Sequence, residues 1–454
     1  MMKWHPSKTL IVRNNKVHQK VNAAPPLILA GSFICLIFIG TLLLMLPIST
    51  NLPITWEQSL FTATSAVTVT GLVIIDTGTS FTLFGQTIIA ILIQCGGIGL
   101  MTFAVVTLIA LGGKIGFLQQ VVAKEAFNQT DASTILSVAK SVLLFSLIIE
   151  MIGFVILSIY WSNELGWADS LFHGFFYTVS AFNNAGFALS PQSLSKYVSD
   201  PVVNFTISAL LISGGLGFTV WREAIKSKSW DKLSPYSKTM ILATIVINLV
   251  AFIVIYCIEY NNPNTLQPLS ESGKLLASWF QAVTTRTAGF NTLPIEQLED
   301  ASTALMLLLM FIGGGSLSTA SGIKVVTFIV LILATYSYLR RDKTITIYKR
   351  EVSRETVTKA LALTMISIAA TCIAIFFLLL TEDAPFIDIV FEAISALGTV
   401  GLSRGLTSSL SGPGEFIIIT LMFIGRLGPL TLAYFLASPR IKRLRYPETQ
   451  ITIG

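Results

Sequence analysis

The stretch that decides the fold is residues 61–72, FTATSAVTVTGL, because the chain repeats its pattern three more times. The other copies are FYTVSAFNNAGF at 176–187, WFQAVTTRTAGF at 279–290 and FEAISALGTVGL at 391–402. Each copy begins with an aromatic residue and ends with a glycine followed by a bulky apolar residue. Self-similarity of this kind indicates one structural unit used four times. The glycines that align are Gly71, Gly186, Gly289 and Gly401.

A second glycine-rich motif follows each copy, some 25 residues further along the chain. It reads GGIG at 96–99, GGLG at 214–217, GGG at 313–315 and GRLG at 425–428. A chance alignment of a glycine-rich chain would produce one such register and not both. We therefore expect four units, each made of a span, a short helix, a glycine-bearing loop and a second span.

The composition predicts a membrane protein. Of the 454 residues, 53% are hydrophobic and only 12% are charged, whereas a soluble domain carries about 25% charged residues. Most of the apolar runs approach the roughly 20 residues that cross a bilayer core. These runs are Leu27–Leu46, Thr87–Leu111, Ser141–Ile159, Thr239–Ile258, Leu305–Ile312 with Val325–Leu339, Ala360–Leu380 and Phe416–Phe423.

Four shorter apolar stretches stand between the spans of each unit. A stretch of 10–14 apolar residues is typical of a re-entrant segment, which is tolerated only where protein or a water-filled pore surrounds it. The fold class is therefore an all-α polytopic membrane protein, with eight transmembrane helices and four re-entrant pore helices in a pseudo-fourfold ring. The predicted pore helices are Trp56–Val69, Trp167–Phe182, Leu275–Thr284 and Phe386–Leu397.

Charge predicts the orientation. Basic residues gather in the N-terminal segment, in three connectors and in the tail, while the intervening segments are acidic. By the positive-inside rule the basic segments are cytoplasmic, so both termini lie inside. The first apolar run is too long for a signal peptide and is expected to be a retained helix. The expected divisions are an N-terminus at 1–26, repeats at 27–112, 136–226, 236–341 (with its second span broken at 312–324) and 355–437, and a tail at 438–454.

The four cysteines, Cys35, Cys95, Cys257 and Cys372, all fall in apolar runs and are unpaired by spacing. We expect them to be small buried hydrophobic residues and neither disulfides nor ligands. The three histidines have no metal-ligand spacing, and no phosphate loop or nucleophile motif is present. The sequence therefore predicts no enzyme and no nucleic-acid binding.

Physical chemistry predicts what the four loops do. A glycine lets a backbone turn its carbonyl toward an axis where a side chain would clash, and rings of carbonyls replace the hydration shell of a cation. The preceding helices would aim their partly negative C-terminal ends at the same axis. We expect a short filter for potassium with looser selectivity than a TVGYG filter. The predicted ion-binding residues are Val69, Thr70, Gly71, Asn184, Ala185, Gly186, Thr287, Ala288, Gly289, Thr399, Val400 and Gly401.

The third repeat breaks the pattern at Gly313–Lys324, GGGSLSTASGIK, a run made largely of small and hydroxylated residues. Glycine costs a helix about 1 kcal/mol relative to alanine, so this segment is predicted to be unwound at membrane depth and to face a cavity. In the fourth repeat Arg426 replaces the glycine of the other motifs. An arginine there is functional by default, either as an electrostatic barrier or as a tether for the segment, and a structural arginine bound to helix ends is the alternative.

These motifs resemble the Ktr, Trk and HKT superfamily of potassium-translocating membrane proteins, and most closely its Ktr branch, over roughly residues 25–440. The resemblance implies one filter glycine per repeat, and glycine at the Gly71 position favours potassium where serine favours sodium. It also implies that the unwound segment is an intramembrane gate. The gate residues are Gly313, Gly314, Gly315, Ser316, Ser318, Thr319, Ser321, Gly322, Lys324 and Arg426.

The resemblance further implies partners and ions. It implies a homodimer with one pore per protomer, a cytosolic KtrA-like ring of nucleotide-binding RCK subunits, a bacterial inner-membrane location and sodium as an activator. No cofactor is expected in this chain beyond a potassium ion in the pore, and membrane lipids surround it. An alternating-access symporter remains the alternative, although its repeats usually show two-part symmetry. Glu150 has no partner evident in the sequence, and Arg286 is expected to hold pore-loop carbonyls.

Overall fold

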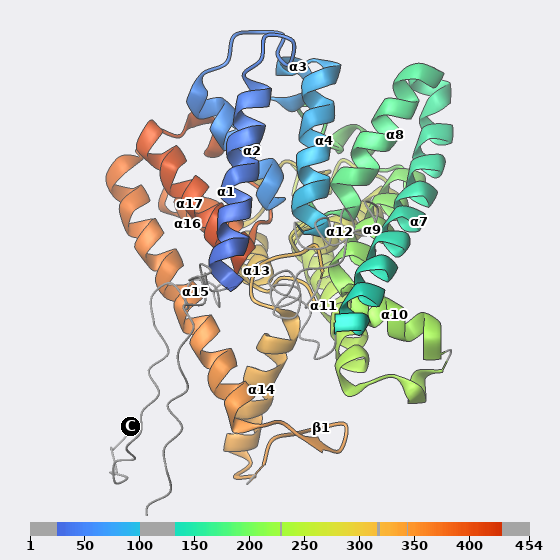
Figure 1. The fold of residues 1–454 in the computed structure, drawn as a ribbon, viewed down its shortest axis with the longest axis vertical. Helices are drawn as coiled ribbons and strands as arrows, with labels where there is room; N and C mark the ends of the chain where they lie inside the picture. Colours follow the sequence, from blue (N-terminus) through green and yellow to red (C-terminus); the bar gives the residue numbers. More distant parts are fainter. Residues whose placement is uncertain (1–24, 100–131, 228, 316–317, 343, 429–454) are drawn as a thin grey trace, which may run out of the picture.

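The computed structural model describes residues 25–99, 132–227, 229–315, 318–342 and 344–428. The predicted cytoplasmic N-terminus, the end of the first repeat and the tail at 438–454 lie outside these residues. Within the described ranges the chain is mostly helical (Figure 1). Its one sheet there is a small antiparallel hairpin, β1 (Thr346–Ile347) with β2 (Arg350–Glu351).

The helices repeat in threes, each set comprising a first helix, a short helix and a second helix. The first helices are α1 (Pro25–Leu44), α7 (Ala132–Leu165), α11 (Pro235–Glu259) and α15 (Arg354–Thr381). The short helices are α2 (Trp56–Thr68), α8 (Trp167–Phe182), α12 (Glu271–Thr284) and α16 (Phe386–Gly398), close to the predicted pore helices. The second helices are α4 (Leu83–Ile98), α9 (Pro201–Leu216), α13 (Asp300–Phe311) and α17 (Gly412–Leu427).

The remaining elements lie in the connections. They are α3 (Thr77–Ser80), η1 (Ser195–Tyr197), α10 (Phe218–Ser227), η2 (Trp230–Lys232), η3 (Ile295–Gln297), α14 (Val325–Leu339) and η4 (Thr407–Ser409). The helix starts follow local sequence rules. Thr55 forms a capping box with Gln58 at the start of α2, and Asp200 caps α9, in which Pro201 occupies the first turn. A side-chain oxygen at such a position satisfies an otherwise unpaired amide of the first turn.

The second helix of each set contacts the short helix of the next set. The contacting pairs are α4 with α8, α9 with α12, α13 with α16, and α17 with α2. The last pair joins the end of the chain to its beginning and closes the ring. The closed ring explains why α2 and α17 lie side by side in Figure 1 although they are far apart in sequence.

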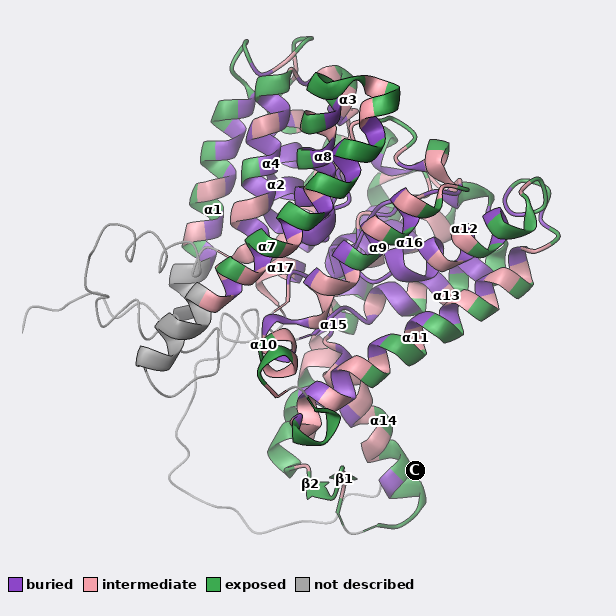
Figure 2. Ribbon diagram, turned by 90° about the vertical axis from the view of Figure 1, so that its right-hand side faces the viewer, coloured by how far each residue is buried: buried purple, intermediate pink, exposed green. Residues whose placement is uncertain are grey.

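The first helices expose apolar residues at the outside of the bundle. Leu147, Ile245 and Met365 are each about half exposed or more, and Figure 2 shows exposed residues along these helices and buried ones toward the centre. Polar residues such as Glu150 and Asn248 are buried instead. The interior is apolar as well, but an apolar outer surface of this extent is unusual for a soluble protein and is the pattern expected of helices that face lipid.

Two expectations from the sequence are wrong. The cysteines are free, as expected, but Cys35, Cys257 and Cys372 lie exposed on their helices and Cys95 is only partly buried. In a uniformly apolar run, sequence alone gives no sign of which face turns inward. The third repeat is also not alone in its broken second span, because α9 and α10 meet at 95°. Gly217 sits between them with φ at 98° and ends the straight helix.

Three helices are long and apolar enough to cross a membrane, and the bent pair of α9 and α10 makes four, counting only the described residues. Four other apolar helices in these ranges are shorter, including α4, α13 and α14. The predicted count of eight spans therefore stays a prediction.

Candidate functional site

Each short helix ends in the same strained turn. The residue two positions before the aligned glycine adopts the left-handed conformation in all four repeats, and the glycine itself also has a positive φ. A left-handed conformation costs a non-glycine residue about 1–2 kcal/mol, and β-branched residues are the least suited to it. Four equivalent strained residues indicate that the ring imposes one loop shape. These residues are Val69, Asn184, Thr287 and Thr399, with φ between 47° and 62°.

Hydroxyl groups of the short helices hold these loops. Ser65 Oγ accepts from the amide of Gly71 at 3.0 Å, and Ser395 Oγ accepts from that of Gly401 at 3.2 Å. In the second repeat Ser180 Oγ donates to the carbonyl of Phe187 at 2.8 Å. The serine six residues before the glycine therefore fixes the loop, and the third repeat, which has Val283 there, uses Thr284 on the carbonyl of Phe290 at 2.5 Å.

The four loops meet around one closed ring. A Cβ added at Gly71 would collide with the carbonyl oxygen of Ala185 in the next repeat, and the same relation recurs from each repeat to the next. No described residue donates a hydrogen bond to these carbonyl oxygens. Free carbonyl oxygens gathered at the ends of short helices can take the place of water around a monovalent cation. The glycine and carbonyl pairs are Gly71 with Ala185, Gly186 with Ala288, Gly289 with Val400 and Gly401 with Thr70.

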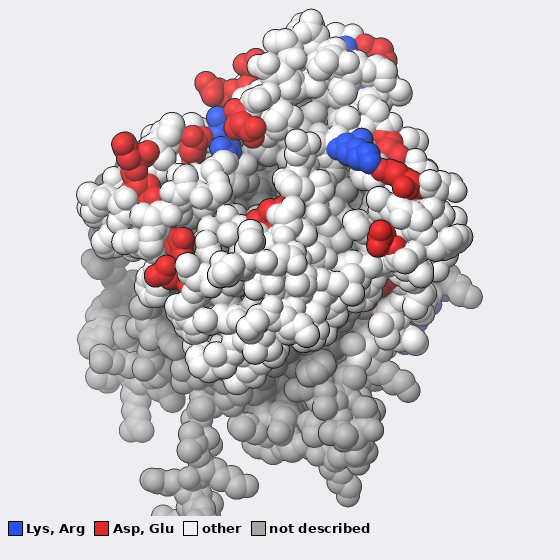
Figure 3. All heavy atoms as spheres, turned by 90° about the horizontal axis from the view of Figure 1, so that it is seen from above, with Lys and Arg blue, Asp and Glu red and all other residues white. Residues whose placement is uncertain are grey.

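An open vestibule of about 270 Å³ lies over this ring and is lined by all four glycines. Asp76 and Glu296 also line it, and Figure 3, which looks from above, shows more acidic than basic side chains on this face. A negative field at the mouth concentrates cations.

The second glycine motif lets the second helices reach the pore loops. A Cβ at Gly96 would collide with the carbonyl of Val67, which stands four residues before the aligned glycine. Gly214 and Gly425 pack in the same way on the equivalent carbonyls of Phe182 and Leu397. The third repeat departs from this rule. There Gly313 packs on the carbonyl of Ser321, inside the unwound segment.

The segment from Gly313 to Lys324 has no helix among its described residues, as predicted. Ser316 belongs to the predicted gate but lies outside the described residues, with Leu317. The ends of the segment lie together, since the amide of Gly313 donates to the carbonyl of Ile323 at 2.9 Å and that of Val325 to Gly314 at 3.1 Å.

The middle of the segment is bonded to the second repeat. The amides of Gly315 and Thr319 donate to the carbonyls of Gly215 and Gly214 at 2.8 and 3.2 Å. Thr319 Oγ1 also lies 3.5 Å from Asn184 Oδ1, next to the second pore loop. The segment therefore joins the second helix of the second repeat to the loop that precedes its aligned glycine, Gly186.

Two partly buried basic side chains contact the segment. Arg426 Nη1 donates to the carbonyl of Thr319 at 2.5 Å and to Ser321 Oγ at 3.2 Å. Its Nη2 donates to the carbonyls of Gly96 and Gly97. Lys324 Nζ donates to the carbonyl of Ala320 at 2.7 Å. These contacts match two of the open alternatives for Arg426, a tether for the segment and a structural arginine bound to the carbonyls at the end of a helix, here α4.

Glu150 has partners that the sequence did not reveal. Both its carboxylate oxygens accept from Gln94 Nε2 at 2.9 Å, and Gln94 Oε1 accepts from Asn183 Nδ2 at 2.5 Å. Asn183 therefore points away from the ring of loops and toward α4 and α7. The hydroxyls of Thr68 and Thr70 lie 2.8 Å from each other.

Arg286 differs from its prediction. Its Nη2 lies 3.5 Å from the carbonyl of Gly313, in the unwound segment, and no bond to a carbonyl of its own loop is present among the described residues. The reason is geometric, because the side chain three residues before the aligned glycine points behind the loop and not toward the ring.

Sequence reasoning missed two charged groups near the vestibule, of which Arg404 is partly buried and Glu392 fully buried. Arg404 pairs with Asp388 at 2.7 Å and donates to Thr303 Oγ1 at 3.1 Å, so it joins the third and fourth repeats. Glu392 accepts from the hydroxyls of Ser403 and Thr407. A charged residue inside the otherwise apolar α16 was the available signal for Glu392.

A closed ring of four loops within a bundle of apolar helices is the architecture of a multi-pass membrane transport protein. The chain belongs to the TrkH family of cation transport proteins, whose family model matches residues 5–443. It is 46% identical to the Ktr system potassium uptake protein B of Bacillus subtilis strain 168, over 98% of this chain and 100% of that protein. The protein of the same name from Vibrio alginolyticus is 42% identical over the full length of both.

A further relative and a solved structure are also similar to this chain. The potassium/sodium uptake protein NtpJ of Enterococcus hirae is 35% identical over 94% of this chain and 96% of that protein. The crystal structure of the potassium transporter TrkH from Vibrio parahaemolyticus matches with a TM-score of 0.75 at 21% identity, covering 93% of this chain and 87% of that one. The structural likeness concerns the fold, and the identities confirm the predicted resemblance to the Ktr branch.

Proposed function

We propose that this protein takes up potassium through a pore whose filter is the ring of loop carbonyls. One observation carries the proposal: four glycines face four carbonyl oxygens around a closed ring, and none of these oxygens has a hydrogen-bond partner in the part of the chain that the structure describes. The acidic residues of the vestibule above the ring support a cation as the transported ion. The relatives named as potassium uptake proteins support potassium as that cation. The proposal places the eight spans and four re-entrant helices of the sequence prediction in the bacterial inner membrane, with both termini cytoplasmic.

Gating belongs to the unwound segment in this proposal. It contacts the second repeat through Gly214 and Gly215, and Arg426 binds it from the fourth. A gate requires two states. In this proposal the segment is closed while these contacts are made and open when they are released. The contacts of Arg426 support the closed state.

Regulation and assembly complete the proposal. A homodimer binds a cytosolic KtrA-like RCK ring that responds to nucleotide, and sodium activates uptake. The relatives named as parts of a Ktr system support a partner subunit, and the relative named as a potassium/sodium uptake protein supports a role for sodium. The basic connectors give an acidic partner a surface to dock on.

The test is rescue of growth and potassium uptake in cells that lack their own uptake systems, with and without sodium. We expect rescue at low external potassium, and faster uptake with sodium present. Uptake of another solute in place of potassium would overturn the function. An alternating-access symporter would show slow, saturating flux in vesicles, whereas a pore gives single-channel currents.

A further inference from the structure

A small cavity lies behind the third pore loop, on the side away from the ring. Its volume is about 10 Å³. Thr244 and Asn248 of α11 line it together with Arg286, and Gly215 and Gly314 close it with backbone. Thr244 and Asn248 are four residues apart and so share one face of their helix.

Three of the residues that line the cavity each carry a buried polar atom that lacks a partner among the described residues: Arg286 Nε, Thr244 Oγ1 and Asn248 Oδ1. The side chains that carry them are each less than a tenth exposed. A buried polar atom without a partner is costly, and most such atoms are hydrogen-bonded to protein or to ordered water. Three such atoms in one cavity call for a ligand.

The chemistry of the three atoms matches one water molecule. Arg286 Nε is a donor, Asn248 Oδ1 is an acceptor, and a threonine hydroxyl is both. About 10–15 Å³ of probe-occupied volume is the least that holds a water, which needs two to four polar partners. We infer that this cavity binds one structural water that bridges Arg286 to Thr244 and Asn248. A chloride ion is larger than water and finds no second positive group there among the described residues.

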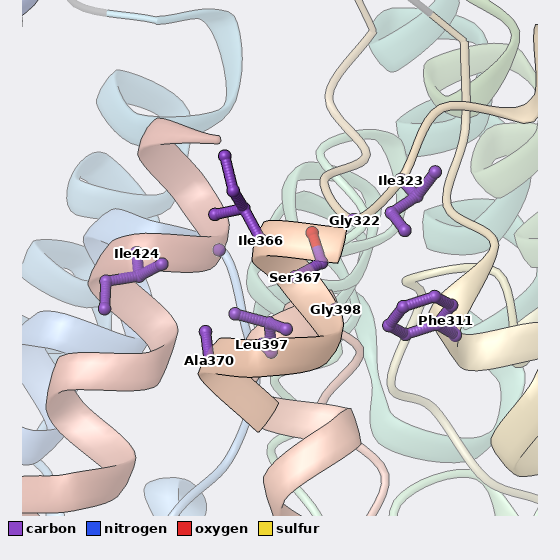
Figure 4. Close-up of a pocket in the computed structure, with 10 residues that line it drawn as sticks. Phe311, Gly322, Ile323, Ile366, Ser367, Ala370, Leu397, Gly398 and Ile424 are labelled. Atoms are coloured by element: carbon purple, nitrogen blue, oxygen red, sulfur yellow. The ribbon is translucent and has the colours of Figure 1, made fainter. Parts of the chain in front are cut away.

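The corresponding crevice of the fourth repeat serves as a contrast. It is lined by apolar side chains, among them Phe311, Ile323 and Leu397 (Figure 4). Gly398 stands three residues before the aligned glycine, where the third repeat has Arg286. The hydroxyl of Ser367 there already donates to the carbonyl of Leu363 at 3.0 Å. This cavity of about 20 Å³ is expected to stay dry, as apolar cavities do.

The water gives Arg286 its position. Arg286 follows the C-terminal end of α12, where partly negative carbonyls stabilise a cation, and its Nη2 lies 3.5 Å from the carbonyl of Gly313. The bridge therefore connects α11 to the third pore loop and to the first residues of the unwound segment. Its effect on gating rests on the proposed function, whereas the water itself does not.

The direct test is a high-resolution structure of the full-length protein in lipid nanodiscs, in which ordered waters are visible. We expect one density peak within hydrogen-bonding distance of all three atoms, and none in the crevice at Gly398. An empty cavity, or a peak that anomalous scattering from bromide identifies as an anion, would overturn the inference.

The second test is a double-mutant cycle on thermal unfolding of the purified protein. We expect Asn248→Leu and Arg286→Met each to lower the midpoint temperature of unfolding. The midpoint of the double variant should fall by less than the sum of the two single effects, because either substitution alone already breaks the water bridge. Thr364→Val is the control, since its hydroxyl donates to its own helix at Ala360, and it should add fully to Arg286→Met. Full additivity of Asn248→Leu with Arg286→Met would contradict the bridge, whatever potassium uptake does.

Discussion

The residue three positions before each aligned glycine is different in every repeat and decides what lies behind the loop. Thr68 bonds back to its own helix, Asn183 reaches Gln94, Arg286 faces the small cavity and Gly398 leaves an apolar gap. The ring is therefore uniform on its inner side and varied on its outer side. The four loops share one shape, but each is held from behind by different contacts.

Gly71→Ser is expected to lower the preference for potassium over sodium several-fold. Gly71 has φ at 90°, and any Cβ there would meet the carbonyl of Ala185, so the ring must open or shift to accept the serine. Competition of sodium with potassium uptake in cells measures the change. Gly166→Ser is the control, since Gly166 has φ at 78° with nothing within 4 Å of an added Cβ. An unchanged ratio in a well-expressed Gly71→Ser protein would contradict a filter at this ring.

Arg426→Met is expected to raise potassium flux, because the unwound segment loses its charge-assisted bonds at Thr319 and Ser321. Leakage of potassium from loaded vesicles measures it. Arg404→Met is the matched control: this arginine is also partly buried and joins two repeats, but it contacts Thr303 and not the segment. Both variants should lower the unfolding midpoint. Equal flux in the two would mean that Arg426 serves stability alone.

At the residue scale, the sequence predicted which residues occupy the loops better than it predicted which side chains bond to one another. Alignment of the four copies found the loop glycines without any structure, because repetition places them at one register. The partners of Glu150 lie 56 and 33 residues away, at Gln94 and Asn183, and no pattern in one sequence reports such a pair. Arg286 was misjudged for the same reason, since spacing gives no side-chain direction.

The second helices differ most at the scale of elements. Three of them end at a glycine with positive φ, at Gly99, Gly217 and Gly428, while α13 ends earlier, at Phe311. The short helices were predicted closely, because each apolar run ends at the loop, and side-chain caps also mark the starts of α2 and α12.

Removal of residues 314–322 is expected to increase potassium flux. The amide nitrogen of Gly313 and the carbonyl oxygen of Ile323 are only 2.9 Å apart. The deletion therefore joins two residues that are already neighbours in the fold. Flux into vesicles that contain purified protein measures the outcome. A well-folded deletion protein that conducts nothing would instead make the segment part of the conduction path or of the scaffold.

At the scale of the whole molecule, the closed ring of contacts was predictable and its asymmetry only partly so. Four equivalent units predict closure, and the pairs from α4 with α8 to α17 with α2 fulfil it. The unwound third repeat was visible as a glycine and serine run. The bend at Gly217 was not, because GGLG at 214–217 reads like the motifs of the first and fourth repeats.

A pore lined equally by four loops and a transporter with two-part symmetry predict different effects of substitution at the aligned glycines. Alanine at each of the aligned glycines places a Cβ against the next repeat, so all four variants should lose most potassium uptake to a similar degree. Gly166→Ala carries the backbone strain of a positive φ without a neighbour, and should keep uptake. Uptake is compared at equal amounts of membrane-inserted protein. Loss confined to two of the four positions would contradict a common pore, because in a ring every carbonyl faces the same ion. The four substitutions are Gly71→Ala, Gly186→Ala, Gly289→Ala and Gly401→Ala.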